Sequence, residues 1–438
     1  TTLSNGNRLK LGNHSNYTLL LIRNTIRIND NRALNKVLSF GLPILPVYCI
    51  NLNIWAKQWL FMPSMGPFKQ QFITDSLFDL SHQLSTIGLK LHVSEDAPLT
   101  TLFNIYKDHP FDHFVSTIEL GEYEHIDQNN VTLFCKKHAV HCDWVWDNTL
   151  ININSLPFDI QQLPDRFTKF KNKVERLIKA PQLLTPSRGT QYSSFTPTTM
   201  EQRLEQHPQL AKTVPIPFTG GESAAMDHLN DYIWKSKAIL HYKSTRNQSL
   251  GRHVSTHFSP WLAHGCLSAR TIYSQIKRFE KAHQKNSSTY WVIYELLWRD
   301  FFHFQCLKYR HLWFKHGGIQ QKYMEYTNDS SKFNQWKSGN TPEPFVNAHI
   351  KELTQTGYMS NRGRQNVASY LVHDCDCDWR WGAEFFEHYL IDADVASNIG
   401  NWMMIAGVGN RSDKIIFNVA QQQQRYDPTN AYINQWLH

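Results

Sequence analysis

The segment from Gly357 to Met404 combines polar side chains with tryptophans at close spacing. Guanidinium, carboxylate and amide groups can hydrogen-bond to an electron-poor ring, and indoles can supply electrons to it. The indoles are Trp379, Trp381 and Trp402. The polar residues are Asn361, Arg362, Arg364, Asp392, Asp394 and Asn398. This composition indicates redox or light chemistry on a bound aromatic cofactor rather than hydrolysis.

Two short motifs in this segment present polar groups at helical spacing. DADVASN (392–398) would put Asp394 and Asn398 on one helical face, and Asp392 could pair with Arg364. NRGRQN (361–366) would place two cations at a helix start, where they oppose the helix dipole. A phosphate, a carboxylate or a flavin dipole would compensate them, unless solvent covers them. The carboxylates could also bind a metal, but no His joins them at close spacing, so we expect no metal site.

Two earlier stretches could contribute to the same site. STHFSPWLAHGCLS (255–268) places hydroxyls and free backbone N–H groups ahead of a helix, which suits a diphosphate, although an ordinary N-cap followed by Pro260 explains the same residues. YELLWRDFF (294–302) sets Glu295 and Arg299 four residues apart on a largely apolar helix. This pair could be a solvated salt bridge, or it could line a ligand cavity. Trp379 and Trp402 could likewise be core packing or an electron path.

The bulk composition indicates a folded protein with an affinity for anions. The chain has 438 residues, of which 41% are hydrophobic and 19% charged. These values suggest about two or three domains and exclude a disordered chain. The net charge of +8 favours a polyanion such as nucleic acid, although a generally basic enzyme would look the same.

The sequence predicts neither export nor a membrane span. No apolar run approaches the roughly 18 residues of a transmembrane helix, and residues 1–16 lack the apolar core of a signal peptide. The 7 cysteines contain no CxxC pair, which favours reduced thiols. We therefore expect a cytoplasmic protein with no membrane partner and a mobile N-terminal tail over residues 1–16.

Residues 17–150 alternate between strand-like and helical patterns. Short β-branched or aromatic runs predict strands, and apolar residues at helical spacing predict helices over 32–40 and 68–88. The predicted strands cover 17–22, 43–50, 89–94, 111–118 and 140–147. This alternation implies a Rossmann-like α/β domain with a parallel sheet and helices on both faces. No GxGxxG follows the first strand, so the common dinucleotide fingerprint is absent.

The rest of the chain divides at a proline-rich connector. Residues 151–220 hold most of the proline clusters and one helical stretch, 166–179, and we interpret them as a long interdomain linker. Residues 221–438 have helical patterns almost throughout, which predicts an all-α second domain. The clearest predicted helices cover 223–240, 268–283, 288–309, 347–357 and 361–373.

Taken together, these segments resemble the photolyase/cryptochrome family, and within it the cryptochrome DASH branch. IRNTIRINDNRAL (22–34) looks like the family's opening motif, and LPDRFTKFKNKVE (163–175) is similar to the linker of DASH members. Further blocks follow in the family's order, and the likeness spans residues 17–430. These blocks are GGESAAMDHLNDYIW, STHFSPWLAHGCLS, STYWVIYELLWRDFF, GYMSNRGRQNVASYLVHD and DVASNIGNWMMIAGVGN.

The resemblance implies an α/β domain followed by a helical domain that holds a folded FAD. The phosphates and ribityl chain would be held by Tyr242, Ser255, Thr256, His257, Phe258 and Ser259. The rest of the cofactor would be lined by Arg299, Tyr358, Asn361, Arg364, Asp392 and Asp394. Asn398 would face flavin N5.

The resemblance also implies a deoxyribodipyrimidine photo-lyase, driven by blue light, that splits cyclobutane pyrimidine dimers in single-stranded DNA by electron transfer from reduced FAD. Glu295 and Asn398 would have catalytic roles. The flipped dimer would be bordered by Glu295, Trp298, Asn361, Arg362, Gln365 and Met404. Met404 stands where a stacking Trp or Tyr is common, which could cost about 1–3 kcal/mol of base binding. The alternative is a blue-light photoreceptor or regulator that binds DNA or RNA with little repair.

Further expectations follow from the same resemblance. Trp402 and Trp379 match the first two members of the family's electron path, and Tyr326 takes the third position, where Trp is usual. Because a tyrosine must lose a proton as it is oxidised, we expect a slower or pH-dependent last hop. Glu119 matches the acid that contacts an antenna chromophore, usually methenyltetrahydrofolate. We expect a monomer that binds single-stranded DNA, with RNA or looped duplex as further candidates, and no signalling tail.

Overall fold

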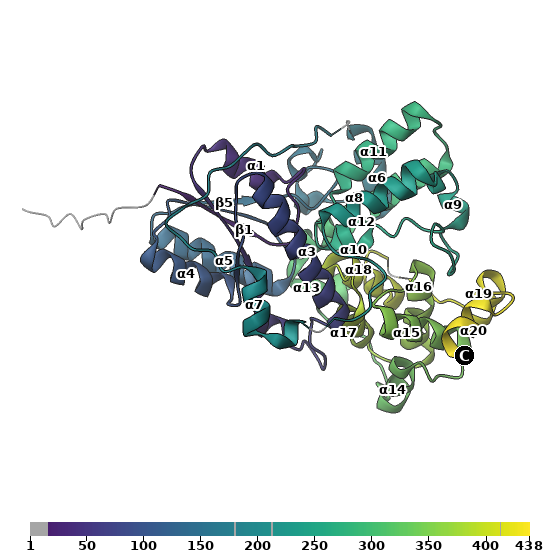
Figure 1. Ribbon diagram of the computed structural model, residues 1–438. Helices are drawn as coiled ribbons and strands as arrows, with labels where there is room; N and C mark the ends of the chain where they lie inside the picture. The colour runs from purple at the N-terminus through teal and green to yellow at the C-terminus, as the bar shows by residue number, and fades with distance from the viewer. Residues whose placement is uncertain (1–15, 179–180, 212, 412) are drawn as a thin grey trace, which may run out of the picture.

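The computed structural model describes residues 16–178, 181–211, 213–411 and 413–438. The expected mobile tail lies outside the described residues, apart from residue 16. A part that contains the sheet and a part made of helices lie side by side, and the chain passes from the first to the second (Figure 1).

Five parallel strands form one sheet in the order β3-β2-β1-β4-β5. The strands are β1 (Thr18–Ile22), β2 (Ile44–Cys49), β3 (His92–Ser94), β4 (His113–Thr117) and β5 (His141–Val145). All five residues of β1 are buried, as expected for the central strand of a parallel sheet covered on both faces. The predicted sheet is therefore confirmed. The strand order reverses between β1 and β4, and such a switch point opens a crevice at the carboxyl ends of the strands.

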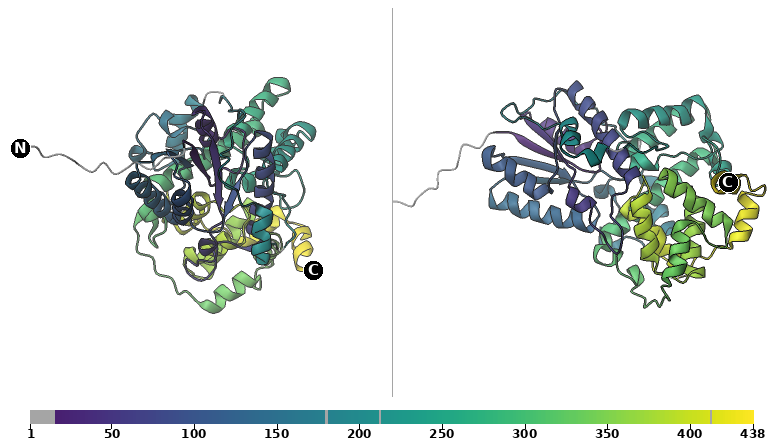
Figure 2. Two further views of the ribbon diagram at one scale, coloured as in Figure 1. Left: turned by 60° about the vertical axis from the view of Figure 1, so that its left-hand side comes forward. Right: turned by 60° about the horizontal axis from the view of Figure 1, so that its bottom comes forward.

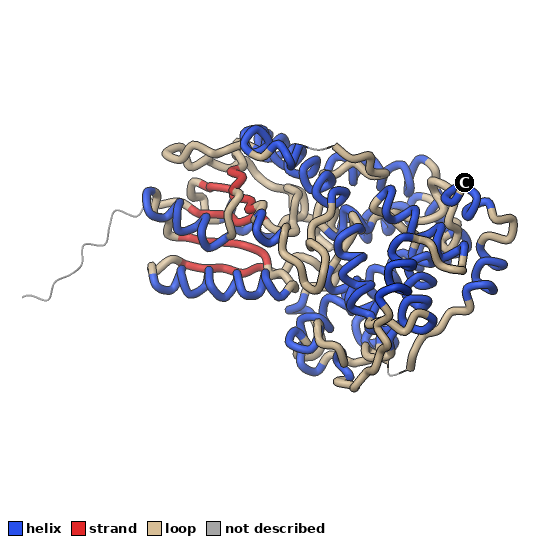
Figure 3. The backbone as a smooth tube through the Cα atoms, turned by 90° about the horizontal axis from the view of Figure 1, so that it is seen from below, coloured by secondary structure: helices blue, strands red, loops and turns tan. Residues whose placement is uncertain are grey.

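Helices cover both faces of this sheet (Figure 3). On one face, Leu20 and Ile22 of β1 belong to the same core as α1 (Arg32–Ser39) and α3 (Pro67–Thr86). On the other face, Leu19 and Leu21 pack in a separate core. That second core is completed by α4 (Pro98–Asp108) and α5 (Glu122–Lys137), two helices that the sequence patterns did not predict. A short helix, α2 (Leu52–Trp55), follows β2.

The proline-rich connector packs back against the sheet before the helical part begins. The ring of Tyr192 stacks on that of Tyr17 at a centroid distance of 3.8 Å, and the amide of Ile44 donates a hydrogen bond to Thr190. The connector contains α6 (Phe167–Val174) and α7 (Met200–Gln206). The long connector therefore packs on the surface of the α/β domain before it reaches the helical part.

The helical part is all-α over its described residues, as predicted (Figure 2). Two of its predicted helices end in π-helical turns, at 231–235 and 370–374. Its helices are α8 (Glu222–Asn230), α9 (Tyr242–Thr245), α10 (Ser259–Ala263), α11 (Ala269–Ala282), α12 (Ser287–Lys308), α13 (Arg310–Trp313), α14 (Ser330–Ser338), α15 (Pro344–Thr356), α16 (Asn361–Ser369), α17 (Trp379–Tyr389), α18 (Val395–Ala406), α19 (Val419–Tyr426) and α20 (Ala431–Leu437).

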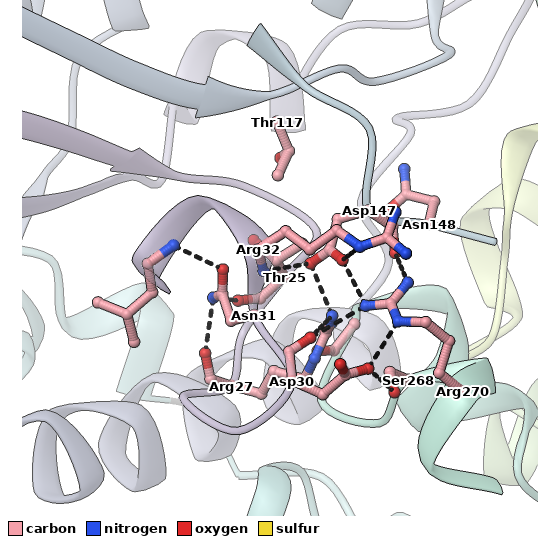
Figure 4. A network of polar contacts seen from close by, with 12 residues as sticks. Thr25, Arg27, Asp30, Asn31, Arg32, Thr117, Asp147, Asn148, Ser268 and Arg270 are labelled. Carbon is pink, nitrogen blue, oxygen red and sulfur yellow. Dashed lines mark hydrogen bonds and ion pairs between the residues drawn. The ribbon is translucent and has the colours of Figure 1, made fainter. Parts of the chain in front are cut away.

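A buried ionic network joins the two parts (Figure 4). Asp147 lies between two guanidinium groups, with its Oδ2 atom 2.7 Å from Nη2 of Arg27 and its Oδ1 atom 2.5 Å from Nη2 of Arg270. The Nε atom of Arg270 lies 2.8 Å from Oδ2 of Asp30. Two residues of the first part thus hold the first turn of α11, which fixes how the sheet meets the helices.

Candidate functional site

Arg364 and Asp392 form an ion pair between α16 and the turn before α18. The Nη2 atom of Arg364 lies 2.8 Å from Oδ2 of Asp392, and its Nε atom donates to the carbonyl of Met359 at 2.9 Å. The pairing predicted from sequence is confirmed. Asp392 is buried, and its Oδ1 atom has no hydrogen-bond partner among the described residues. This oxygen is an acceptor that a bound donor could satisfy.

Asp394 joins α12 to the start of α18. As the N-cap residue of α18, it accepts through Oδ1 from the amide of Ser397 at 2.8 Å, while its Oδ2 atom lies 2.7 Å from Nε2 of His303. Arg299 is also near, with Nη2 3.8 Å from Oδ2. Burial alone would raise the pKa of Asp394, but His303 and Arg299 hold that pKa below its usual range. His303 was missed from sequence, although its position four residues after Arg299 puts both on one face of α12.

Asn398 and Trp402 lie on successive turns of α18, next to α17. The Nδ2 atom of Asn398 donates to the carbonyl of Ala383 at 2.9 Å, which leaves its Oδ1 atom free to accept. Trp402 is buried against α17, where a Cβ atom added to Gly382 would lie 2.1 Å from the indole. The absence of a side chain at position 382 therefore lets the two helices approach.

The expected pair of Glu295 and Arg299 does not form. Glu295 accepts hydrogen bonds from the hydroxyl of Tyr242 and from Nη1 of Arg246, the latter at 2.9 Å. Arg299 donates instead to the backbone carbonyls of Asn148 and Leu262. The two side chains therefore contact different neighbours. Glu295 contacts α9 and the loop that follows it, and Arg299 contacts the loop after β5 and α10. Burial raises the pKa of Glu295, against the effects of Tyr242 and Arg246.

The segment 255–259 leads into α10 without capping it. Phe258 is the N-cap residue, and no side chain makes a cap hydrogen bond, so the ordinary N-cap interpretation of the hydroxyls is wrong. His257 adopts a φ of +49° and places its Nδ1 atom 3.0 Å from the hydroxyl of Tyr358. Burial lowers the pKa of His257 to about 4. This loop segment thus lies beside Tyr358, and Ser255, Thr256 and Ser259 are not used as helix caps.

Arg362 and Gln365 present unpartnered polar atoms from α16. The Nη2 atom of Arg362 lies 3.2 Å from Oδ1 of Asn247, and its guanidinium lies 4.9 Å from the ring centroid of Tyr426. Its Nε atom and the Oε1 atom of Gln365 are buried without a partner among the described residues. Because Asn247 follows Arg246, which binds Glu295, the loop after α9 links Glu295 with Arg362.

The other three residues expected to border the dimer lie on α12, α16 and α18. Trp298 stacks on Phe167 of α6, with ring centroids 3.8 Å apart and planes 10° from parallel. Met404 is partly buried against the core and lies two residues after Trp402 on α18. Asn361 is the first residue of α16 and is exposed.

The three residues of the expected electron path are not in mutual ring contact. Trp379 is fully buried, and its indole N–H donates to the carbonyl of His316 at 3.0 Å. The rings that contact Trp402 are those of Phe386 and Trp336, at centroid distances of 5.1 and 6.4 Å. Tyr326 contacts only the ring of His316 within the described chain, at 5.4 Å. Sequence reasoning missed Trp336, because no spacing rule connects α14 with α18.

A cavity of about 310 Å³ lies at the switch point of the sheet and extends to the helical part. Glu119 lines its sheet side, where Oε2 accepts from Nδ2 of Asn24 at 3.0 Å and Oε1 accepts from the hydroxyl of Thr117 at 2.8 Å. Burial raises the pKa of Glu119. The helical side is lined by residues that include Arg299, His303 and Asp394. One cavity therefore connects the predicted antenna acid with the predicted cofactor residues.

Two features are absent from the described residues. No group of three or more His, Cys, Asp or Glu side chains is placed to hold a metal ion. No helix in the described ranges is long and apolar enough to cross a membrane.

Comparison with known families matches both parts of the chain. The family described as "DNA photolyase" matches residues 18–205, and the family described as "FAD binding domain of DNA photolyase" matches residues 291–438. A flavin needs donors and acceptors around its ring, and buried polar atoms without partners, such as Oδ1 of Asp392 and Nδ1 of His303, fit that need.

Individual proteins show the same relationship. Cryptochrome DASH of Synechocystis sp. is 39% identical over 430 residues, covering 96% of this chain and 87% of the relative. Cryptochrome DASH of Danio rerio is 38% identical over 438 residues, covering 97% and 83%. The crystal structure of the Synechocystis sp. PCC6803 cryptochrome superposes with a TM-score of 0.90 at 38% identity, covering 97% of this chain and 89% of that chain. An archaeal photolyase from Sulfolobus tokodaii shares the fold, with a TM-score of 0.79 at 23% identity and coverage of 96% and 90%. The chain therefore belongs to the photolyase/cryptochrome family, as a flavoprotein of the cryptochrome DASH type.

Proposed function

We propose that this flavoprotein splits cyclobutane pyrimidine dimers in single-stranded DNA under blue light. The observation that carries the proposal is the set of groups around Glu295. The loop after α9 ties Glu295 to Arg362, and the Nε atom of Arg362 and the Oε1 atom of Gln365 are buried without a partner in the described part of the chain. Buried polar atoms are costly when unsatisfied, so a base with several donors and acceptors would stabilise this arrangement.

Reduced FAD would supply light absorption and the transferred electron, and the chain would hold and orient it. Asp392 would offer its Oδ1 atom, which has no partner among the described residues, to a ring N–H, and the hydrogen bond from Arg364 orients that carboxylate. Asn398, fixed by the carbonyl of Ala383, would present its Oδ1 atom toward flavin N5. The hydroxyls of the segment 255–259 and Tyr242 would serve the phosphates and ribityl chain, because none of those hydroxyls caps α10.

On the substrate side, the carboxyl of Glu295 would hydrogen-bond to the bases, as acceptor or donor, and Trp298 would stack on them. Burial raises the pKa of Glu295, so its carboxyl can act as a hydrogen-bond donor at a higher pH than an exposed one. Trp298 already stacks on Phe167, which holds its ring in one orientation. Met404 would take the place of a second stacking ring.

A single-stranded substrate is supported by the energetics of flipping and by charge. Flipping a base out costs least where no partner strand must be unpaired. The net charge of +8 supports attraction to a polyanion, and RNA or a looped duplex would share that attraction. We propose a monomer as the working unit.

The cavity beside Glu119 is the proposed antenna site. Methenyltetrahydrofolate is the chromophore that the resemblance implies. The Sulfolobus tokodaii photolyase is described with two FAD molecules and a novel light-harvesting cofactor, which makes a second flavin the alternative occupant here. The buried carboxyl of Glu119 would bind a ring N–H of either chromophore.

The second candidate function is a blue-light photoreceptor that binds nucleic acid with little repair. Met404 favours this alternative, because a thioether offers less stacking surface than an aromatic ring. It differs from the lyase in the fate of the dimer, since a photoreceptor would leave the dimer intact.

One experiment separates the two functions. Protein loaded with FAD and reduced by dithionite is mixed with ultraviolet-irradiated oligothymidine and exposed to blue light, and the thymine absorbance is followed. We expect recovery in the light and none in the dark. The variant Glu295→Gln should lose most of the rate, whereas Glu201→Gln, at an exposed position on α7, should not. No recovery with fully reduced flavin would reject the lyase.

A further inference from the structure

The thiols of Cys135 and Cys142 meet where α5 leads into β5. Cys135 lies in the last turn of α5, and Cys142 is the second residue of β5, the strand at one edge of the sheet. Between them the chain reverses through Ala139, which adopts a φ of +55°, and the amide of Val140 donates to the carbonyl of Cys135 at 2.9 Å. Both side chains pack in the core between the sheet and α5, and their thiols are hydrogen-bonded to each other. This turn therefore holds two sulfur atoms in contact.

The two thiols differ in their access to solvent. Cys135 is completely buried, whereas Cys142 is only partly buried. The hydrogen bond with Cys135, together with those of Trp144 and Thr132, lowers the pKa of the Cys142 thiol against the effect of burial. The thiolate is the form of cysteine that attacks oxidants, and a small oxidant reaches a partly exposed thiol more easily than a buried one. Cys142 is therefore the thiol that meets an oxidant first.

The other cysteines lack this combination, and all 7 cysteines lie in the described ranges. Cys49 is partly buried like Cys142, but its thiol bonds to the hydroxyl of Thr101 instead of another thiol, and burial raises its pKa to about 12. The remaining thiols are buried, and burial raises the pKa of each one. These thiols belong to Cys266, Cys306, Cys375 and Cys377. Among the cysteines, a partly exposed thiol in contact with a second thiol therefore occurs at Cys142 alone.

We propose that Cys142 and Cys135 form a peroxide-reactive dithiol, a redox site separate from the flavin site. The Cys142 thiolate attacks hydrogen peroxide, the O–O bond breaks, and Cys142 becomes a sulfenic acid while hydroxide leaves and takes up the proton that the thiol had released. The Cys135 thiol then attacks the Cys142 sulfur, an S–S bond forms, and the sulfenic oxygen leaves as water with the proton of Cys135. In total, two thiols are oxidised to one disulfide, and one hydrogen peroxide is reduced to two waters.

The burial of Cys135 confines this reaction to a single chain. A completely buried thiol cannot reach a sulfur atom of another molecule, so the disulfide forms within the chain and not between copies. Because the two thiols are already in contact, the bond can close with a small rearrangement at the turn between α5 and β5. The disulfide then protects Cys142 from further oxidation to a sulfinic acid, a product that thiols do not reverse. Two molecules of a thiol in solution restore both cysteines and are themselves oxidised to a disulfide.

The test uses the full, FAD-loaded chain in the dark, so that no step depends on the proposed light chemistry. The protein is reduced with dithiothreitol, desalted, treated with a small molar excess of hydrogen peroxide, alkylated with N-ethylmaleimide and digested with trypsin. Trypsin cuts after Lys136 and Lys137, so Cys135 and Cys142 fall in separate peptides that only a disulfide keeps together. We expect mass spectrometry to find these two peptides joined after peroxide treatment and separate again after dithiothreitol.

Three variants assign the role of each thiol. Cys135→Ser should stop at the sulfenic acid of Cys142, which dimedone traps, and Cys142→Ser should give neither the linked peptides nor a dimedone adduct on Cys135. Cys49→Ser is the matched control, since it removes another partly buried thiol, and it should form the link at an unchanged rate. The proposal is overturned if the unsubstituted protein gives no linked peptides, if Cys142 proceeds to sulfinic acid while Cys135 stays reduced, or if Cys49 is oxidised as fast as Cys142. The unsubstituted protein alone decides these outcomes, so a variant that fails to fold does not affect the test.

Discussion

Arg364 and Asp392 are joined by a 2.8 Å ion pair that uses only one of the two carboxylate oxygens, and the other oxygen is buried without a partner among the described residues. The pair bridges α16 and the turn before α18, and both elements carry proposed flavin contacts. It therefore orients both elements and leaves one acceptor for a ligand.

Replacing Asp392 by Asn should weaken both the fold and FAD retention. The change leaves the Arg364 guanidinium beside a neutral amide, and breaking a largely buried pair costs about 3–5 kcal/mol. Urea denaturation gives the free energy of unfolding, and absorbance gives the FAD content after gel filtration. Asp231→Asn is the control, because its partners Arg252 and His253 are 76% and 36% exposed and such surface pairs contribute about 0–1 kcal/mol. Equal losses in the two variants would contradict the prediction.

Asp147→Asn should destabilise the junction between the sheet and the helices. Its carboxylate is fully buried between Arg27 and Arg270, so the substitution leaves two buried cations without their shared anion. We expect a loss of about 3–5 kcal/mol in the free energy of unfolding. Urea denaturation followed separately by circular dichroism and by flavin fluorescence measures the effect. A loss no larger than that of Asp231→Asn would show that the network is not important for stability.

Asp300 should make the stability of the protein depend on pH near neutrality. Burial raises the pKa of Asp300 to about 7, despite hydrogen bonds from the amides of Leu150 and Ile151. The folded protein therefore binds a proton that the unfolded chain has already released above about pH 4. The contribution of protonated Asp300 to the free energy of unfolding is complete below about pH 4. It is lost as the pH rises through about 7, and the loss amounts to at most about 4 kcal/mol.

The measurement is urea denaturation of the protein and of Asp300→Asn across this range. The variant cannot ionise, so its free energy of unfolding should fall less between about pH 5 and about pH 8. Parallel pH profiles for the two proteins would show that Asp300 does not titrate in this range.

Met404→Trp should strengthen binding of the damaged strand. An added stacking ring contributes about 1–3 kcal/mol per base. Fluorescence anisotropy with a labelled oligothymidine that contains one dimer measures the dissociation constant, and undamaged oligothymidine is the control ligand. An equal gain for both ligands would mean that residue 404 contacts the strand outside the dimer cavity.

Gly382→Ala should displace Trp402. The new Cβ atom would lie 2.1 Å from the indole, which is already held by Phe386 and Trp336. Overpacking of this kind costs about 1–3 kcal/mol. Thermal unfolding and near-ultraviolet circular dichroism of the tryptophans measure the change. An unaltered spectrum with unaltered stability would show that α17 and α18 have room to separate.

Local sequence patterns were sufficient to predict the architecture, a parallel sheet followed by an all-α part. Apolar runs predicted all five strands within a few residues. The pattern is clearest for β1 and β2, because a strand buried on both faces must be apolar along its length. The pair of Arg364 and Asp392 was also predictable, since a cation at a helix start needs a compensating charge. The family's motifs then indicated the cofactor, because the ordered blocks of the family extend over most of the chain.

The tertiary structure decided which groups meet across helices that are distant in sequence. The i,i+4 spacing of Glu295 and Arg299 suggested a pair, yet each side chain found partners on a different neighbouring element. The contact of Trp336 with Trp402 and the unpartnered hydroxyl of Tyr326 also depend on how α14, α17 and α18 pack. Periodicity along a chain shows which face of a helix is buried, but it carries no information on which other helix covers that face.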